Sequence, residues 1–322
     1  MAGFGTIPKP HAENLTEIGD FIEIECLRRA DRNVSVLDVT RIIERESDRI
    51  SQDVVMQLVR DSVGDLENRA SHSGSAGAQY PFSFDTSGDL VQFTESADER
   101  DWCIYLFLLL ATRLDMKSSR RHSGEDASVL FEMLCCEVGK RLWGGAEDSR
   151  VKAFVFGTAR QADGKRDDEE LDIDSFSAAV NHLCVELNEG VEFDPKSKGR
   201  VTARDGKLDV VVWRSFSDRR DGQMIAFGQC KTGTNWDSDL GKLRPEDFFS
   251  KWVRQHPAVL PLRLYFIADR AVHRWYDRSK DGGVLLDRCR IMEYCSNLPA
   301  DLLKRIRNWV TAAAKSHGLL VS

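Results

Sequence analysis

Two short stretches decide the fold: GKLDVVVW at Gly206–Trp213 and QMIAFGQCK at Gln223–Lys231. Both are rich in β-branched and aromatic residues, and the polar stretch Arg214–Gly222 separates them. Short apolar runs bounded by polar and glycine residues are typical of strands. The pattern therefore predicts two strands that pair in an antiparallel manner through an irregular connection.

Polar side chains interrupt both predicted strands. Asp209 stands inside the first apolar run, where a carboxylate is costly to bury unless it binds something. In the second run, Gln229 and Lys231 are two residues apart and share a face, whereas Cys230 points to the other face. If the strands pair, Asp209, Gln229 and Lys231 converge on one patch near the end of the sheet.

The flanking sequence predicts a mixed α/β fold. Apolar residues recur at helical spacing in Leu130–Trp143, Phe176–Leu187, Phe248–Arg254 and Leu302–Ala314. Strand-like runs occupy Val151–Gly157 and Leu262–Ala268, and Asp163–Asp174 is expected to be a solvated acidic loop. Helices and strands thus alternate around a mixed sheet.

The first third of the chain predicts a separate, mainly helical domain. Helical spacing extends over residues 15–66, and Asp101–Met116 is a strongly apolar helix. Ala70–Pro81 is rich in Ser and Gly and is expected to be a flexible connection. The polar segment Lys117–Gly124 marks the boundary between the predicted domains, residues 1–120 and residues 121–322.

Charge and composition restrict the function. Residues 200–322 hold 22 Lys and Arg against 14 Asp and Glu, a net charge of +8, whereas the chain as a whole carries −7. A basic C-terminal part can dock a polyanion. The longest apolar run is too short to span a bilayer, and neither a secretory signal nor the paired Cys or His spacing of a zinc site is visible. We therefore expect a cytoplasmic protein with mostly buried thiols.

The spacing from Asp209 to Gln229-Cys230-Lys231 resembles the PD-(D/E)XK, or restriction-endonuclease-like, nuclease superfamily. Its motif is an Asp on one strand, followed about twenty residues later by (D/E/Q)-x-K at the end of the next strand. An upstream helix often adds a glutamate, and the helix that contains Glu132 looks like that helix. The resemblance covers about Ser128–Ala268, and Gln in place of the second acid is similar to the Mrr-like branch.

The resemblance implies a role for each of these residues. Asp209 would be the central metal ligand, assisted by the amide oxygen of Gln229 and the backbone carbonyl of Cys230. Lys231 would orient or help deprotonate the attacking water and offset charge on the phosphate. Glu132 would contact the metal directly or through water, and Glu137 on the same helix competes for that role. Oxygen ligands with open water positions suit Mg²⁺ or Mn²⁺.

The expected function is metal-dependent hydrolysis of DNA phosphodiester bonds, with double-stranded DNA as partner, in a bacterial restriction or antiviral defence system. The N-terminal domain would sense, form homo-oligomers or recruit a partner defence protein. Two alternatives stay open: a catalytically inactive nuclease-like scaffold, and a nucleic-acid-binding subunit of a larger complex. Asp209 could also cap a turn, and Lys231 could be a solvated lysine at a strand end.

Overall fold

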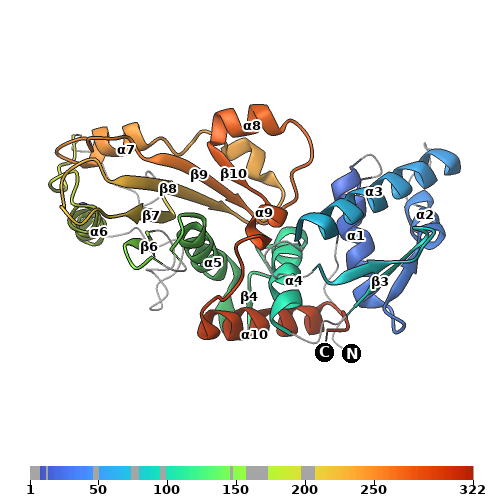
Figure 1. Cartoon of the computed structure of the whole chain (residues 1–322). Coiled ribbons are helices and arrows are strands. Elements are labelled where there is room, and N and C mark those ends of the chain that lie inside the picture. The colour runs from blue at the N-terminus through green and yellow to red at the C-terminus, as the bar shows by residue number, and fades with distance from the viewer. Residues whose placement is uncertain are drawn as a thin grey trace.

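The two decisive stretches form neighbouring strands of a mixed five-stranded sheet, in the order β10-β9-β8-β7-β6 (Figure 1). The strands are β6 (Val151–Val155), β7 (Val210–Arg214), β8 (Met224–Lys231), β9 (Leu262–Ile267) and β10 (Val284–Leu286). β7 runs antiparallel to β6 and β8, whereas β8, β9 and β10 run parallel to one another. The computed structural model describes residues 8–11, 14–45, 51–73, 80–94, 99–145, 148–156, 173–196 and 207–321.

Both faces of this sheet are covered by helices. Alternate residues of β7 point to opposite sides, so Val210 and Val212 pack with α5 (Ala127–Leu142) on one face. Val211 and Trp213 pack on the other face, against α6 (Ile173–Leu187) and α7 (Pro245–Trp252). Because β7 is buried on both sides, its sequence is a continuous apolar run rather than an alternating one.

The N-terminal half consists of helices with a small sheet. Its helices are α1 (Leu15–Arg28), α2 (Val36–Glu44), α3 (Gln52–Ser73) and α4 (Glu99–Arg113). The sheet has the order β1-β3-β2, from β1 (Asn33–Ser35), β2 (Phe82–Phe84) and β3 (Leu90–Phe93). In the described part of the chain, no helix is both long enough and apolar enough to cross a bilayer.

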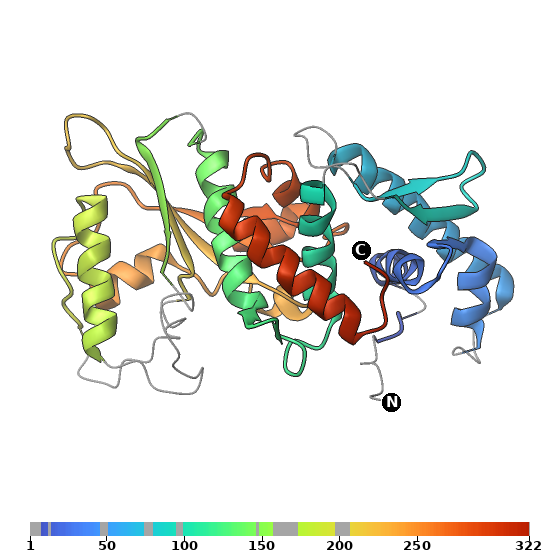
Figure 2. The ribbon, with the colours of Figure 1, turned by 90° about the horizontal axis from the view of Figure 1, so that it is seen from below.

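The two halves share one hydrophobic core. It extends from the α1 residue Ile18, through the apolar helix α4, to Leu319 near the C-terminus. The last helix, α10 (Ala300–Ser316), lies between α4 and α5 and contacts both (Figure 2). The remaining elements are β4 (Arg121–His122), β5 (Glu125–Asp126), the 3₁₀-helix η3 (Asn235–Asp239), α8 (Trp275–Gly282) and α9 (Arg288–Met292). The predicted domain boundary near residue 120 stays a prediction.

The expected mixed α/β architecture is confirmed, with some differences in detail. α7 begins three residues before the expected helix because Pro245 occupies its first turn, where the missing N–H of proline costs nothing. The expected connection Ala70–Pro81 is wrong at its start, since α3 continues to Ser73. Its middle, and most of the acidic segment Asp163–Asp174, lie outside the described residues.

Candidate functional site

The ends of β7 and β8 bring the predicted residues together. Asp209 immediately precedes β7, and its backbone N–H donates to the carbonyl oxygen of Gly228 at 2.9 Å. Its side chain turns toward β8, where Oδ2 accepts the backbone N–H of Cys230 at 2.7 Å. Gln229 and Lys231 flank Cys230 in the last three residues of β8. The Asp209 carboxylate is therefore in contact with the Gln-Cys-Lys segment.

The surroundings of Asp209 solvate a negative charge less well than water does. Burial raises its pKa to about 6, against a usual value of 3.8. The hydrogen bond from Cys230 and the positive charges of Lys231 and Lys207 oppose this rise but do not cancel it. A carboxylate whose charge is only partly compensated is a suitable ligand for a cation.

Gln229 contributes a polar atom that nothing in the described chain satisfies. Its side chain is 1% exposed, and its Oε1 atom has no hydrogen-bond partner among the described residues. An unpaired buried carbonyl oxygen costs roughly 1–3 kcal/mol. Such an atom, in the residue that precedes the Asp209-bound Cys230, fits a site that a hard cation completes, because amide oxygen is a good ligand for Mg²⁺ or Mn²⁺.

Lys231 ends β8 and forms an ion pair with Asp239, the last residue of η3. Both side chains are partly exposed to solvent, with 26% and 21% of their surface accessible. The sequence reasoning missed Asp239. It lies beyond a turn, eight positions after Lys231, where neither strand nor helix periodicity relates the two residues.

The helix α5 presents Glu132, not Glu137, to this end of the sheet. Glu132 is 5% exposed. Burial raises the pKa of the thiols of Cys135 and Cys230, and the charges of Glu132 and Asp209 raise it further. Both carboxylates therefore lie within electrostatic reach of the same two sulfur atoms. Glu137 instead pairs with Arg141, one turn further along α5.

Tyr265 is a further residue of this region that the sequence did not single out. It is the β9 partner of Gln229 in the sheet, and its hydroxyl donates to the backbone oxygen of Trp236 in η3 at 2.8 Å. Burial raises the pKa of Tyr265, and the carboxylates of Asp239 and Asp209 add to this effect. It attaches η3 to the strand that lies beside the Gln-Cys-Lys segment.

The donor set limits what can bind. Asp209 offers a carboxylate, Gln229 an amide oxygen and Cys230 a backbone carbonyl, which together are hard oxygen donors. Among the residues that the structure describes, no cluster of three or more His, Cys, Asp or Glu side chains is arranged to hold a metal. The orphaned Oε1 of Gln229 is the observation that fits a metal ion here.

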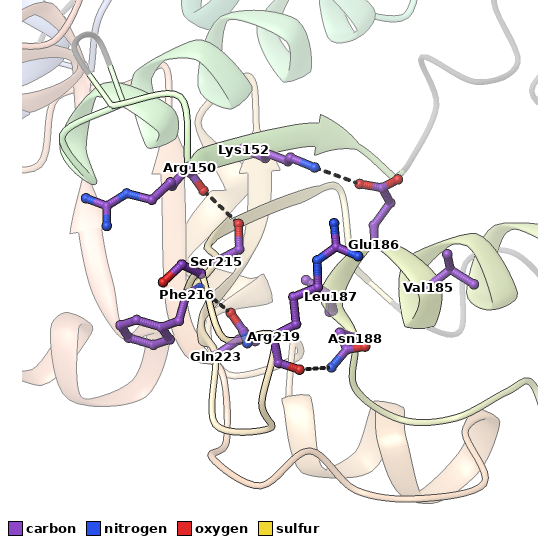
Figure 3. A pocket seen from close by; sticks show the side chains of 11 residues that line it. Arg150, Lys152, Val185, Glu186, Leu187, Asn188, Ser215, Phe216, Arg219 and Gln223 are labelled. Carbon is purple, nitrogen blue, oxygen red and sulfur yellow. Dashed lines mark hydrogen bonds and ion pairs between the residues drawn. The ribbon is translucent and has the colours of Figure 1, made fainter.

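A pocket beside the sheet lies elsewhere (Figure 3). It has a volume of about 470 Å³ and lies at the far end of β7, where Ser215 follows the strand. Lys152 and Glu186 line it and pair with each other at 3.6 Å. Asp209 precedes the opposite end of this five-residue strand, roughly 17 Å away at the usual rise per residue. This pocket is therefore distinct from the predicted site.

Other features of the sequence are structural. Each of the eight cysteines lies in the described part of the chain, none is in a disulfide, and seven are buried. Trp236 and Trp252 are buried in the core. The guanidinium of Arg278 packs over the ring of Trp236, 4.5 Å from its centroid, so this basic side chain takes part in packing.

Comparison with known proteins gave no relative: no protein-family model, curated protein or solved structure was found to match this chain.

Proposed function

We propose that this protein is a divalent-metal-dependent endonuclease that hydrolyses phosphodiester bonds of double-stranded DNA. The observation that carries the proposal is the contact of the Asp209 carboxylate with the Cys230 amide, together with the unpaired Oε1 of Gln229, the residue before Cys230. Further support comes from the chain order. A helix with a buried glutamate, a strand headed by Asp209 and a strand that ends in Gln-Cys-Lys follow each other as the PD-(D/E)XK resemblance implies.

In this proposal Asp209, Gln229 and the Cys230 carbonyl hold Mg²⁺ or Mn²⁺. When bound, the ion polarises the phosphoryl oxygen and lowers the pKa of water. Lys231 donates hydrogen bonds to the phosphate and to the attacking water, which offsets negative charge as the P–O bond breaks. Glu132 orients a water molecule from the α5 side. Water adds across the scissile bond, so that one product carries the phosphate and the other the hydroxyl.

The biological setting belongs to the same proposal. The chain would act in the cytoplasm as an effector of bacterial restriction or antiviral defence, and the N-terminal half would receive the signal or hold a second protomer or a partner protein. The shared core supports a tight connection between that half and the sheet, because a contact made on α1, α3 or α4 reaches the sheet through packed side chains.

Plasmid cleavage tests the proposal. Wild type should nick and linearise plasmid DNA in Mg²⁺ or Mn²⁺ but not in EDTA, and Lys231→Ala should lower the rate roughly 10²–10³-fold, as removal of a charge-stabilising donor does. Lys152→Ala is the matched control, because this exposed lysine lies at the far end of the sheet. Cleavage that Lys231→Ala leaves unchanged would refute the site. DNA binding without metal-dependent cleavage would favour an inactive scaffold or a DNA-binding subunit.

A further inference from the structure

The chain that leaves β8 returns at once to the side chain of Lys231. Gly233 makes this possible, since its φ of 77° lies in the left-handed region that favours glycine. The chain then enters η3, whose last residue is Asp239. The Asp239 carboxylate pairs with the ammonium groups of both Lys231 and Lys242. Lys242 lies three residues after Asp239 in the sequence. One carboxylate therefore pairs with two lysines at the proposed site, and the three groups together keep a net positive charge.

η3 is fixed by contacts on several sides, although its N-cap side chain makes no hydrogen bond. Trp236 is its buried anchor: its indole N–H donates to Asp269 at 2.9 Å, and its carbonyl accepts the hydroxyl of Tyr265 at 2.8 Å. Arg278 stacks on the Trp236 ring. The carboxylate of Asp239 thus has a fixed position relative to the strands, unlike an ordinary surface carboxylate.

Asp239 is charged at neutral pH. Burial alone would raise its pKa, but hydrogen bonds from Lys231 and Lys242 outweigh burial and hold the pKa below its usual value. An exposed ion pair contributes only about 0–1 kcal/mol to stability. The importance of this pair lies in geometry, because a long lysine side chain that is held in one orientation does not have to be ordered when substrate binds.

We propose that Asp239 is a positioning residue that holds the Lys231 ammonium at the end of β8 and away from Asp209. This inference rests on the proposed nuclease function. Lys231 already acts electrostatically on Asp209, so that carboxylate is within reach as a partner once Asp239 is neutral. Without Asp239, Lys231 would pair with Asp209, occupy the carboxylate that the metal needs and leave the phosphate without its donor.

Kinetics with three variants test the role. Asp239→Asn keeps the shape and removes the charge, and we expect kcat to fall about 10-fold or more, in line with the cost of a misplaced catalytic group. KM for DNA should not rise, because a negative charge near the phosphate has been removed. Asp239→Glu should restore part of kcat. Asp237→Asn is the matched control, since Asp237 lies in the same 3₁₀-helix but pairs with Arg278.

A measurement that needs no activity separates this inference from the proposed function. The rate at which an acetylating reagent modifies Lys231 in the full-length chain, without DNA or metal, is followed by mass spectrometry. Asp239→Asn should change the rate several-fold, because the Lys231 ammonium exchanges Asp239 for Asp209 as its partner, and Asp237→Asn should not. An unchanged rate, or a changed rate with kcat and KM like those of wild type, overturns the positioning role. If wild type shows no metal-dependent cleavage, the nuclease proposal fails and the role falls with it, while acetylation still reports on the ion pair.

Discussion

Asp209 is a residue whose charge opposes folding in the absence of metal. Its pKa of about 6 in the folded chain exceeds the usual 3.8. The folded state therefore prefers the protonated carboxyl, and the cost of ionising it is small below pH 4, grows between pH 4 and pH 6 and is complete above about pH 6. We expect Asp209→Asn to raise the free energy of unfolding at pH 8 by about 1–3 kcal/mol, and by only about a third as much at pH 4.5. Urea unfolding in EDTA at both pH values measures this, and an equal effect at the two pH values would contradict it.

A bound cation should offset the free-energy cost of the Asp209 charge and stabilise the folded state. Ligands that bind only the folded state stabilise it, by about 2.7 kcal/mol at a concentration a hundred times Kd. Mn²⁺ at saturating concentration is therefore expected to raise the melting temperature of wild type and to leave that of Asp209→Asn nearly unchanged. Differential scanning fluorimetry over a Mn²⁺ titration, with Ca²⁺ for comparison, checks the effect. Equal shifts in both proteins would place the ion elsewhere.

At the scale of elements, α5 must lie close to the sheet if Glu132 is to reach its end. A Cβ atom at Gly139 would lie 2.7 Å from Cγ2 of Val212, so only glycine allows this approach. Gly139→Ala should push α5 outward, destabilise the protein by about 1–3 kcal/mol and lower cleavage. Gly64→Ala in α3 is the matched control, because nothing lies within 4 Å of its added Cβ. The urea midpoints of the two variants measure the difference in stability. Equal midpoints would show that α5 can shift to accommodate the added Cβ atom.

The elements that the sequence predicted well are those with long, regular patterns. The apolar runs at β7 and β8 and the helical spacing of α5 were sufficient, because each segment buries enough surface to impose its own period. The strands β1 to β5 and β10 went unpredicted. β10 has three residues and exists only through its parallel pairing with β9, which no local pattern encodes.

The candidate site shows the same division. The alternation of side chains along β8 predicted that Gln229 and Lys231 share a face. This prediction needs only one strand, because both residues lie in β8. The contact of Asp209 with the Cys230 amide depends on strand register, and the pairing of Lys231 with Asp239 depends on a turn and on the anchoring of η3. Such partners are set by tertiary packing, which spacing in the sequence does not reveal.

At the scale of the molecule, a buried ionic cluster joins the two halves. Asp20 of α1 is fully buried and pairs with Arg69 of α3, Arg113 of α4 and Arg288 of α9. Asp20 and Arg288 are 268 positions apart, so the sequence offered no means of relating them. Burial raises the pKa of Asp20, but the three guanidinium groups outweigh it and hold the pKa below its usual value.

This cluster predicts that the halves unfold together. Asp20→Ala would leave the buried guanidinium of Arg288 without its bidentate partner. Breaking a buried pair by removal of one member costs about 3–5 kcal/mol, because the remaining charge stays buried without compensation. We expect calorimetry of Asp20→Ala to show one transition at a lower temperature. Glu17→Ala is the matched control on the same helix; its pair with Arg113 spans 3.7 Å at a more exposed position, and its loss should cost less than about 1 kcal/mol.

The alternative is that the halves are independent domains that only touch. In that case Asp20→Ala would split the calorimetric trace into two transitions and leave the melting of the sheet-bearing half where it is in wild type. Residues 121–322 expressed alone would then fold and keep any nuclease activity. The shared core argues against this outcome, since α10 packs on both α4 and α5 and would lose its α4 face to water. We therefore expect the isolated fragment to be at most partly folded, with near-ultraviolet circular dichroism much weaker than that of the full chain.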